Sequence, residues 1–110
     1  MQPASEYAKE IASTIYHQIG GNQFAVMTGT KNFVYGENEL GPYLQMKLSP
    51  NKNGFTHLVI QYHDATDEYS MEFCKVDRYG NKSRTHLIVR VHAEDLAPIF
   101  EDETGLYTHL

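Results

Sequence analysis

Four segments of the chain alternate apolar and polar residues with a period of two, and this alternation constrains the fold more than any other feature. A period of two is that of a β-strand with one buried face. The four segments are residues 43–48, 57–63, 69–76 and 85–93. Short, turn-rich connections join them, and short connections favour hairpins. The sequence therefore predicts an antiparallel meander.

Helical periodicity brackets this meander. Apolar residues recur at helical spacing over residues 4–19 and again over residues 94–104. Ser5 is placed to cap the first helix. Gly20 and Gly105 are placed to end the two helices in a left-handed conformation.

Glycines punctuate the stretch between the first helix and the meander, so its path is the hardest to predict. We interpret residues 24–28 and residues 32–35 as two further short strands. The predicted fold class is α+β, with one domain over residues 1–110. It is an antiparallel β-meander of four to six strands, flanked by an N-terminal and a C-terminal α-helix.

The second face of the predicted sheet is not wholly polar. In the last strand, Leu87, Val89 and Val91 are predicted to face the core. A sheet with one solvated face shows cleaner alternation than this one. The apolar residues that fall on the second face are Val59, Cys74, Val76 and Ile88. Either each helix covers one face, or a homodimer or a partner covers the second; we expect some cover from the first helix.

Composition bounds the class of protein. The 110 residues suffice for one domain with its own core. A net charge of −5 argues against broad, non-specific binding to nucleic acid or to acidic membranes. A single cysteine allows no internal disulfide, which fits a reducing cytosol. Neither a membrane span of roughly 20 apolar residues nor a secretory signal is evident, so we expect a cytoplasmic protein with no membrane partner.

Six histidines and the lone Cys74 are the residues most able to carry chemistry. His57 and His63 share a predicted strand face, but six residues along a strand span roughly 20 Å, too far to share one metal ion. Cys74 becomes a nucleophile only beside a base, and His86 is that base if the hairpin register places the two opposite each other. A lone cysteine in a strand is more often a small buried hydrophobe. We expect a non-enzymatic protein with no catalytic residues, no metal and no cofactor.

Acidic residues gather in two places. Asp64, Asp67 and Glu68 surround the turn between two predicted strands, and residues 101–103 add three more carboxylates on the last helix. Such clusters are ordinarily a solvated face. A sharper interpretation is that they imitate nucleic-acid phosphates and occupy a basic groove of another protein.

The hairpin that runs from Lys75 to Arg90 has the opposite charge. Its candidate binding residues are Arg78, Tyr79, Lys82 and Arg84. A hairpin that interleaves an aromatic ring with cations can contact phosphates and stack on a base. A solvated turn has the same composition, so the two interpretations stay open.

The last six residues end in a short apolar tail. Termini fray unless something ties them down. Leu106, Tyr107 and Leu110 are the residues that we expect to provide this tie, either by packing on the fold or by forming an interface.

Three separated blocks carry a resemblance. They are Gly-Gly-Asn-Gln-Phe at residues 20–24, Met-Thr-Gly-Thr-Lys-Asn-Phe at 27–33 and Thr-Gly-Leu-Tyr-Thr-His-Leu at 104–110. Together they resemble a group of small proteins of bacteriophages and other mobile elements. The resemblance implies a phage or mobile-element origin and a bacterial cytoplasmic setting, and carries over no site residue because the group has no established activity. In topology alone, the meander closed by a helix resembles the Whirly-type single-strand binders.

Small size, tyrosine-rich faces and segregated charge favour a function in binding. Our leading hypothesis is a non-enzymatic phage or mobile-element accessory protein that binds a host or phage macromolecule, with inhibition of a host nucleic-acid-binding protein as one form of it. The alternative is a single-stranded nucleic-acid-binding module that uses the hairpin from Lys75 to Arg90.

Overall fold

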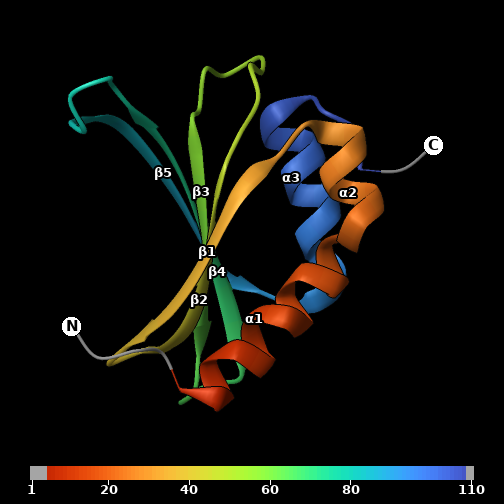
Figure 1. The fold of residues 1–110 in the computed structure, drawn as a ribbon, viewed down its shortest axis with the longest axis vertical. Helices are drawn as coiled ribbons and strands as arrows, with labels where there is room; N and C mark the ends of the chain where they lie inside the picture. The colour runs from red at the N-terminus through yellow and green to blue at the C-terminus, as the bar shows by residue number, and fades with distance from the viewer. Residues whose placement is uncertain (1–4, 109–110) are drawn as a thin grey trace.

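Five antiparallel strands form one open sheet in this computed structural model, which describes residues 5–108 (Figure 1). Their order across the sheet is their order in the chain, as expected for a meander. The strands are β1 (Lys31–Asn38), β2 (Gly41–Lys47), β3 (His57–His63), β4 (Glu68–Val76) and β5 (Lys82–Val91). The predicted α+β antiparallel meander is confirmed.

Helices precede and follow the sheet. They are α1 (Glu6–Ile19), α2 (Gly21–Thr28), the 3₁₀ turn η1 (Ala93–Asp95) and α3 (Leu96–Thr104). The Ser5 side chain accepts a hydrogen bond from the Ala8 N–H at 3.1 Å, so it caps α1 as predicted. Gly105 ends α3 with a φ of 76°, in the left-handed region that favours glycine.

The prediction of a strand over residues 24–28 is wrong, because these residues belong to α2. Phe24 and Thr28, four residues apart, are both buried, which is the spacing of one helix face. The Phe24 ring packs edge-on against Phe100 of α3, with 4.9 Å between the ring centroids. A short apolar run fits a strand and a buried helix equally well, and here the contact with α3 decides.

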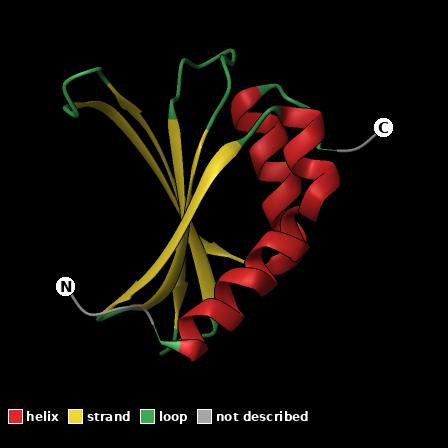
Figure 2. Ribbon diagram, in the orientation of Figure 1, coloured by secondary structure: helices red, strands yellow, loops and turns green. Residues whose placement is uncertain are grey.

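All the helices of the described chain lie on one side of the sheet (Figure 2). The core fills the space between them and the inner sheet face, and includes Ile15, Ile19, Phe24, Met46, Leu58, Ile60, Met71, Phe73, Leu96 and Phe100. The expectation that α1 covers the second face is therefore wrong. The inner face is apolar across several neighbouring strands, and one short helix is too narrow to cover it, so α1, α2 and α3 share it.

β5 departs from simple alternation at a β-bulge. The pairing between β4 and β5 shifts between Tyr69 and Met71, and Arg90 has a positive φ of 59°. Val91 is buried as predicted, but Leu87 and Val89 are 56% and 58% exposed, so their assignment to the core is wrong. Ile88 lies opposite Met71 and packs against the core, which corrects its assignment to the second face.

The C-terminal tail is only partly tied down. Leu106 packs against the core as predicted, whereas the Tyr107 side chain is 72% exposed and does not pack on the fold. Thr108 is buried instead, and its N–H and hydroxyl both donate to the Glu101 carboxylate. Leu110 lies outside the described residues. No helix in the described part of the chain is long and apolar enough to cross a membrane.

Candidate binding surface on the open face of the sheet

The side of the sheet away from the helices is uncovered, and we call it the open face. Strand pairing places one residue from each strand in a row across the middle of this face. The row consists of Val34, Gln45, Val59, Glu72 and Leu87. Val34 is 54% exposed, and Leu87 and Val89 are exposed at the other edge. The open face thus presents apolar side chains among polar ones.

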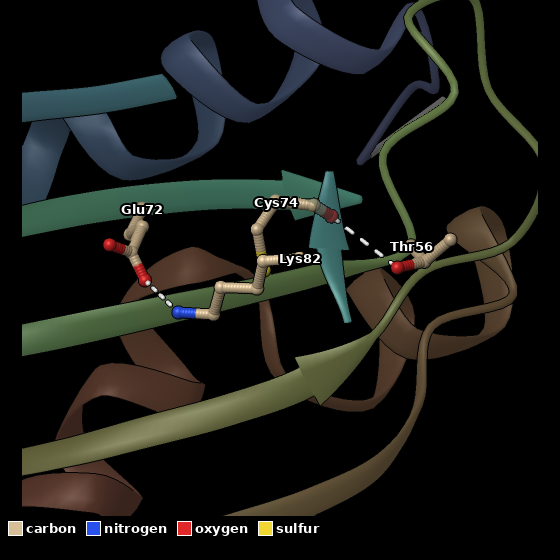
Figure 3. A network of polar contacts seen from close by, with 4 residues as sticks. All are labelled: Thr56, Glu72, Cys74 and Lys82. Atoms are coloured by element: carbon tan, nitrogen blue, oxygen red, sulfur yellow. Dashed lines mark hydrogen bonds and ion pairs between the residues drawn. The ribbon is translucent and has the colours of Figure 1, made fainter. Parts of the chain in front are cut away.

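A shallow depression of about 170 Å³ lies beside this row. Val59, Cys74 and Val76 supply its apolar wall, and Gln45, His57 and Lys82 supply its polar wall. The Lys82 side chain extends past Cys74 towards Glu72, where Nζ lies 3.2 Å from Oε1 (Figure 3). The depression can take one apolar side chain, with the Lys82 ammonium at its rim.

Cys74 and His86 do not form a nucleophile and base pair. Cys74 lies opposite Thr85, whereas His86 lies opposite Phe73, so the two side chains point to opposite faces of the sheet. The His86 Nε2 instead lies 3.4 Å from a Glu103 oxygen of α3. The observed register therefore does not place His86 as a base for Cys74. Burial also raises the pKa of the Cys74 thiol.

Thr56 stabilises the edge of the depression. Its Oγ1 accepts a hydrogen bond from the Val76 N–H at 2.8 Å and donates to the Cys74 carbonyl at 3.4 Å (Figure 3). The pairing of β4 with β5 shifts between Lys75 and Val76, so Thr56 satisfies a backbone group at an irregularity of β4. Burial, with a smaller contribution from Lys47, lowers the pKa of the neighbouring His57.

The four predicted hairpin residues point in different directions. Arg78 and Tyr79 lie at the tip, with the guanidinium 5.3 Å from the Tyr79 ring centroid. Lys82 turns to the open face and Glu72, as described above. Arg84 turns to the other side, where it donates to the Asn53 carbonyl at 2.8 Å and stacks over Phe55. The structure therefore does not bring these cations together into one phosphate-binding groove.

The predicted acidic turn lies at the opposite end of the sheet and is ordered by tyrosines. Asp64 accepts a hydrogen bond from the Tyr7 hydroxyl, and Asp67 accepts one from the Tyr62 hydroxyl. These bonds are the main reason why the pKa of each tyrosine is raised to about 12. Glu68 contacts the His92 Nε2 at 3.4 Å. The structure thus brings Asp64 and Asp67 together in one cluster.

The second acidic stretch is largely engaged within the molecule. Glu101 accepts from Thr108, and Glu103 pairs with His86. Within residues 5–108, no group of three or more His, Cys, Asp and Glu side chains is placed to hold a metal ion.

The sequence did not identify Tyr7 and Tyr62 as part of the Asp64 and Asp67 cluster. The partner of Tyr7, Asp64, is distant in the sequence, and the partner of Tyr62, Asp67, follows a tight turn. Gln61 was also missed: on the open face its amide donates to the carbonyls of Gly41 and Tyr62 and accepts from Asn38. In β3 it alternates with the apolar residues on the same side as His57 and His63, so the pattern did not set it apart. Leu87 and Val89 were wrongly assigned to the core for a different reason. The bulge at Arg90 changes the face to which they point, and the alternation of apolar and polar residues does not reveal a bulge.

Comparison with known proteins found no matching family model, no matching curated protein and no matching solved structure.

Proposed function

We propose that this chain is a non-enzymatic binding protein and that its open face docks a partner protein. The observation that carries the proposal is the group of apolar side chains on a sheet face that no described element covers. Val34 is exposed at the β1 edge, Leu87 and Val89 are exposed at the β5 edge, and Val59 lines the depression between the two edges. Several apolar side chains left exposed on one uncovered sheet face favour its use as an interaction surface.

The chemistry of the open face favours a protein over a polyanion. Apolar residues alternate with Gln45, Glu72 and Lys82 across the face, and protein interfaces ordinarily combine apolar and polar side chains in this way. Lys82 is already paired with a carboxylate. The net charge of −5 adds no attraction for a nucleic acid.

The biological setting is part of the proposal. The three sequence blocks described above support a phage or mobile-element accessory protein that acts in the bacterial cytoplasm on a host or phage macromolecule. The Asp64 and Asp67 cluster, held in place by two tyrosines, supports one form of this role, in which ordered carboxylates replace phosphates in a basic groove of a host nucleic-acid-binding protein.

The test compares matched charge insertions. Leu87→Asp and Val89→Asp alter the open face, whereas Val26→Asp alters α2 at a residue that is 82% exposed on the helical side. Tagged proteins are used to capture partners from phage-infected bacterial lysate. We expect a partner that Val26→Asp retains and that both open-face variants lose. A partner retained by all three variants would contradict docking at the open face.

Single-stranded nucleic acid is the second candidate, and the exposed Arg78 and Tyr79 pair at the hairpin tip favours it. Binding through this tip predicts affinity for single-stranded DNA that falls by about 0.7 log units per phosphate contact for each decade of salt. Replacing Arg78, Lys82 and Arg84 with Glu is then expected to abolish binding. Absence of binding at low salt would leave the protein partner as the better candidate.

A further inference from the structure

One end of the open face is positively charged, although the chain as a whole carries a net charge of −5. Strand pairing sets Lys31 opposite Lys47, and Lys47 opposite His57, in one row across this end. Both lysines are exposed, and neither forms an ion pair within residues 5–108. Like charges directly opposite each other on a sheet are unfavourable. The described part of the chain therefore supplies no counter-charge to these two neighbouring cations.

This row of lysines leads directly to the depression on the open face. His57 belongs both to the row and to the wall of the depression. Burial and then the charge of Lys47 lower the pKa of His57, so the positive potential of Lys47 reaches the wall, and the imidazole is mostly neutral near pH 7. Lys82 brings a further ammonium to the rim, where Glu72 already neutralises it. The uncompensated positive charge is therefore on the Lys47 side of the depression.

These positions set the spacing of a complementary ligand. Neighbouring strands lie about 4.8 Å apart, so Lys47 stands about one strand spacing from His57 and Lys31 about two. An extended chain advances about 3.3 Å per residue. A segment whose apolar side chain enters beside Val59 and Cys74 therefore brings the residues one to three positions away from that side chain over the two lysines.

The lining of the depression favours an acidic peptide over a single-stranded nucleic acid. Proteins hold unpaired bases by stacking them on aromatic rings, and His57 is the only ring among the lining residues. Val59, Cys74 and Val76 form the apolar wall, and the methylene chain of Lys82 extends past Cys74 (Figure 3). Such a wall suits an aliphatic side chain.

We propose that this end of the open face binds a partner segment that inserts one aliphatic side chain into the depression and places carboxylates over Lys31 and Lys47. The inference rests on the proposed function, because it names the chemistry of the segment that docks at the open face. The lysines select the charge of the segment and the depression selects its aliphatic side chain. Opposite charges across an interface also steer the encounter of the two partners.

A defined peptide tests this chemistry directly. The probe is the capped peptide Ser-Glu-Glu-Leu-Glu-Glu-Ser, whose symmetry lets either chain direction place carboxylates over the lysines. Its titration is followed in the amide NMR spectrum of the protein, and we expect the shifts to centre on residues 45–47, 57–59 and 74–76. Peptides with Ser in place of Leu, or with Gln in place of every Glu, are expected to bind about five-fold or more weakly. Equal binding of either control peptide would overturn the proposal.

Matched lysine variants locate the charge. Lys31→Gln and Lys47→Gln are each expected to raise the dissociation constant of the peptide about three-fold, and the double variant about ten-fold. Lys75→Gln removes the same charge from an exposed lysine that lies opposite Arg84 on the helical side of the sheet, and is expected to leave the constant unchanged. Melting temperatures check that each variant folds. Equal weakening by Lys47→Gln and Lys75→Gln, or no binding at millimolar peptide, would overturn the proposal.

Two further results separate this inference from the proposed function and from the nucleic-acid alternative. A short oligo-dT that shifts the same amides at lower concentration than the peptide would overturn the acidic segment in favour of nucleic acid. A lysate partner lost by Leu87→Asp and Val89→Asp, with no peptide binding, would overturn this inference alone and leave docking at the open face. Peptide binding that depends on Lys31 and Lys47, with a lysate partner that Leu87→Asp and Val89→Asp retain, would support this inference and contradict docking at Leu87 and Val89.

Discussion

Lys82 reaches along the open face to Glu72, with 3.2 Å between Nζ and Oε1, although Lys82 lies opposite Val76 and Glu72 lies opposite Leu87. The lysine side chain therefore runs along the strands, past the depression, before it meets the carboxylate. Any partner that inserts a side chain at Val59 and Cys74 meets this pair at the rim of the depression.

The pair is expected to matter more for binding than for stability. Its side chains are 55% and 32% exposed, and such pairs contribute about 0.2–1 kcal/mol. Lys82→Ala and Glu72→Gln are each expected to lower the free energy of unfolding by less than about 1 kcal/mol. Urea denaturation of both single variants and the double variant measures the coupling, and a coupling above this range would contradict the interpretation.

Cys74 is expected to be unreactive while the protein is folded. Its side chain is 2% exposed, and burial raises the thiol pKa, which leaves little thiolate near neutral pH. Colour development with a thiol reagent at pH 8 is expected to be slow in buffer and rapid in denaturant. The control is Val89→Cys in a Cys74→Ala background, which is expected to react rapidly without denaturant. Rapid reaction of native Cys74 would show that the depression opens.

Thr56→Val is expected to destabilise the fold. The substitution keeps the β-branched shape but removes the oxygen that accepts from the Val76 N–H. An unsatisfied, partly buried N–H costs about 1–3 kcal/mol. Thr85→Val, at an exposed position of the neighbouring strand, is the matched control and is expected to change stability by less than about 0.5 kcal/mol. Equal effects of the two variants in thermal or urea unfolding would contradict the role of Thr56.

The meander was predictable because alternation is a local signal. His57–His63 coincides with β3, and each clear strand has short connections that fix its neighbours. The placement of the helices was not predictable in this way. Both faces of the meander carry apolar residues, and which face α1 covers depends on contacts with β2 and α3, which are distant from α1 in the sequence.

The candidate site was predictable only in part. Asp64 and Asp67 were identified from their clustering, but the hydroxyl of Tyr7 reaches Asp64 from a helix 57 residues away in the chain. Leu87 and Val89 were assigned to the core because alternation assumes a regular strand, and the bulge at Arg90 reverses their direction. The open face is created by the tertiary structure, including the bulge at Arg90. The sequence contains its residues but does not show that they lie on one face.

Alkaline pH is expected to weaken the acidic end of the sheet. Tyr62 and Tyr7 have pKa values raised to about 12, chiefly because their hydroxyls donate to Asp67 and Asp64. In the unfolded chain a tyrosine ionises near pH 10. Since the folded state holds these protons more tightly, the contribution of the two hydrogen bonds is complete below about pH 10 and is lost as the pH rises towards 12.

Removal of both hydroxyls is the corresponding experiment. The Tyr7→Phe, Tyr62→Phe double variant is expected to be less stable than the unmodified protein at pH 8, and the difference between the two is expected to shrink between pH 10 and pH 12. Tyr79→Phe, at the exposed hairpin tip, is the control and is expected to leave the pH dependence unchanged. Urea unfolding at a series of pH values provides the measurement. A stability difference that stays constant across this pH range would show that the hydroxyls do not hold the Asp64 and Asp67 carboxylates in place.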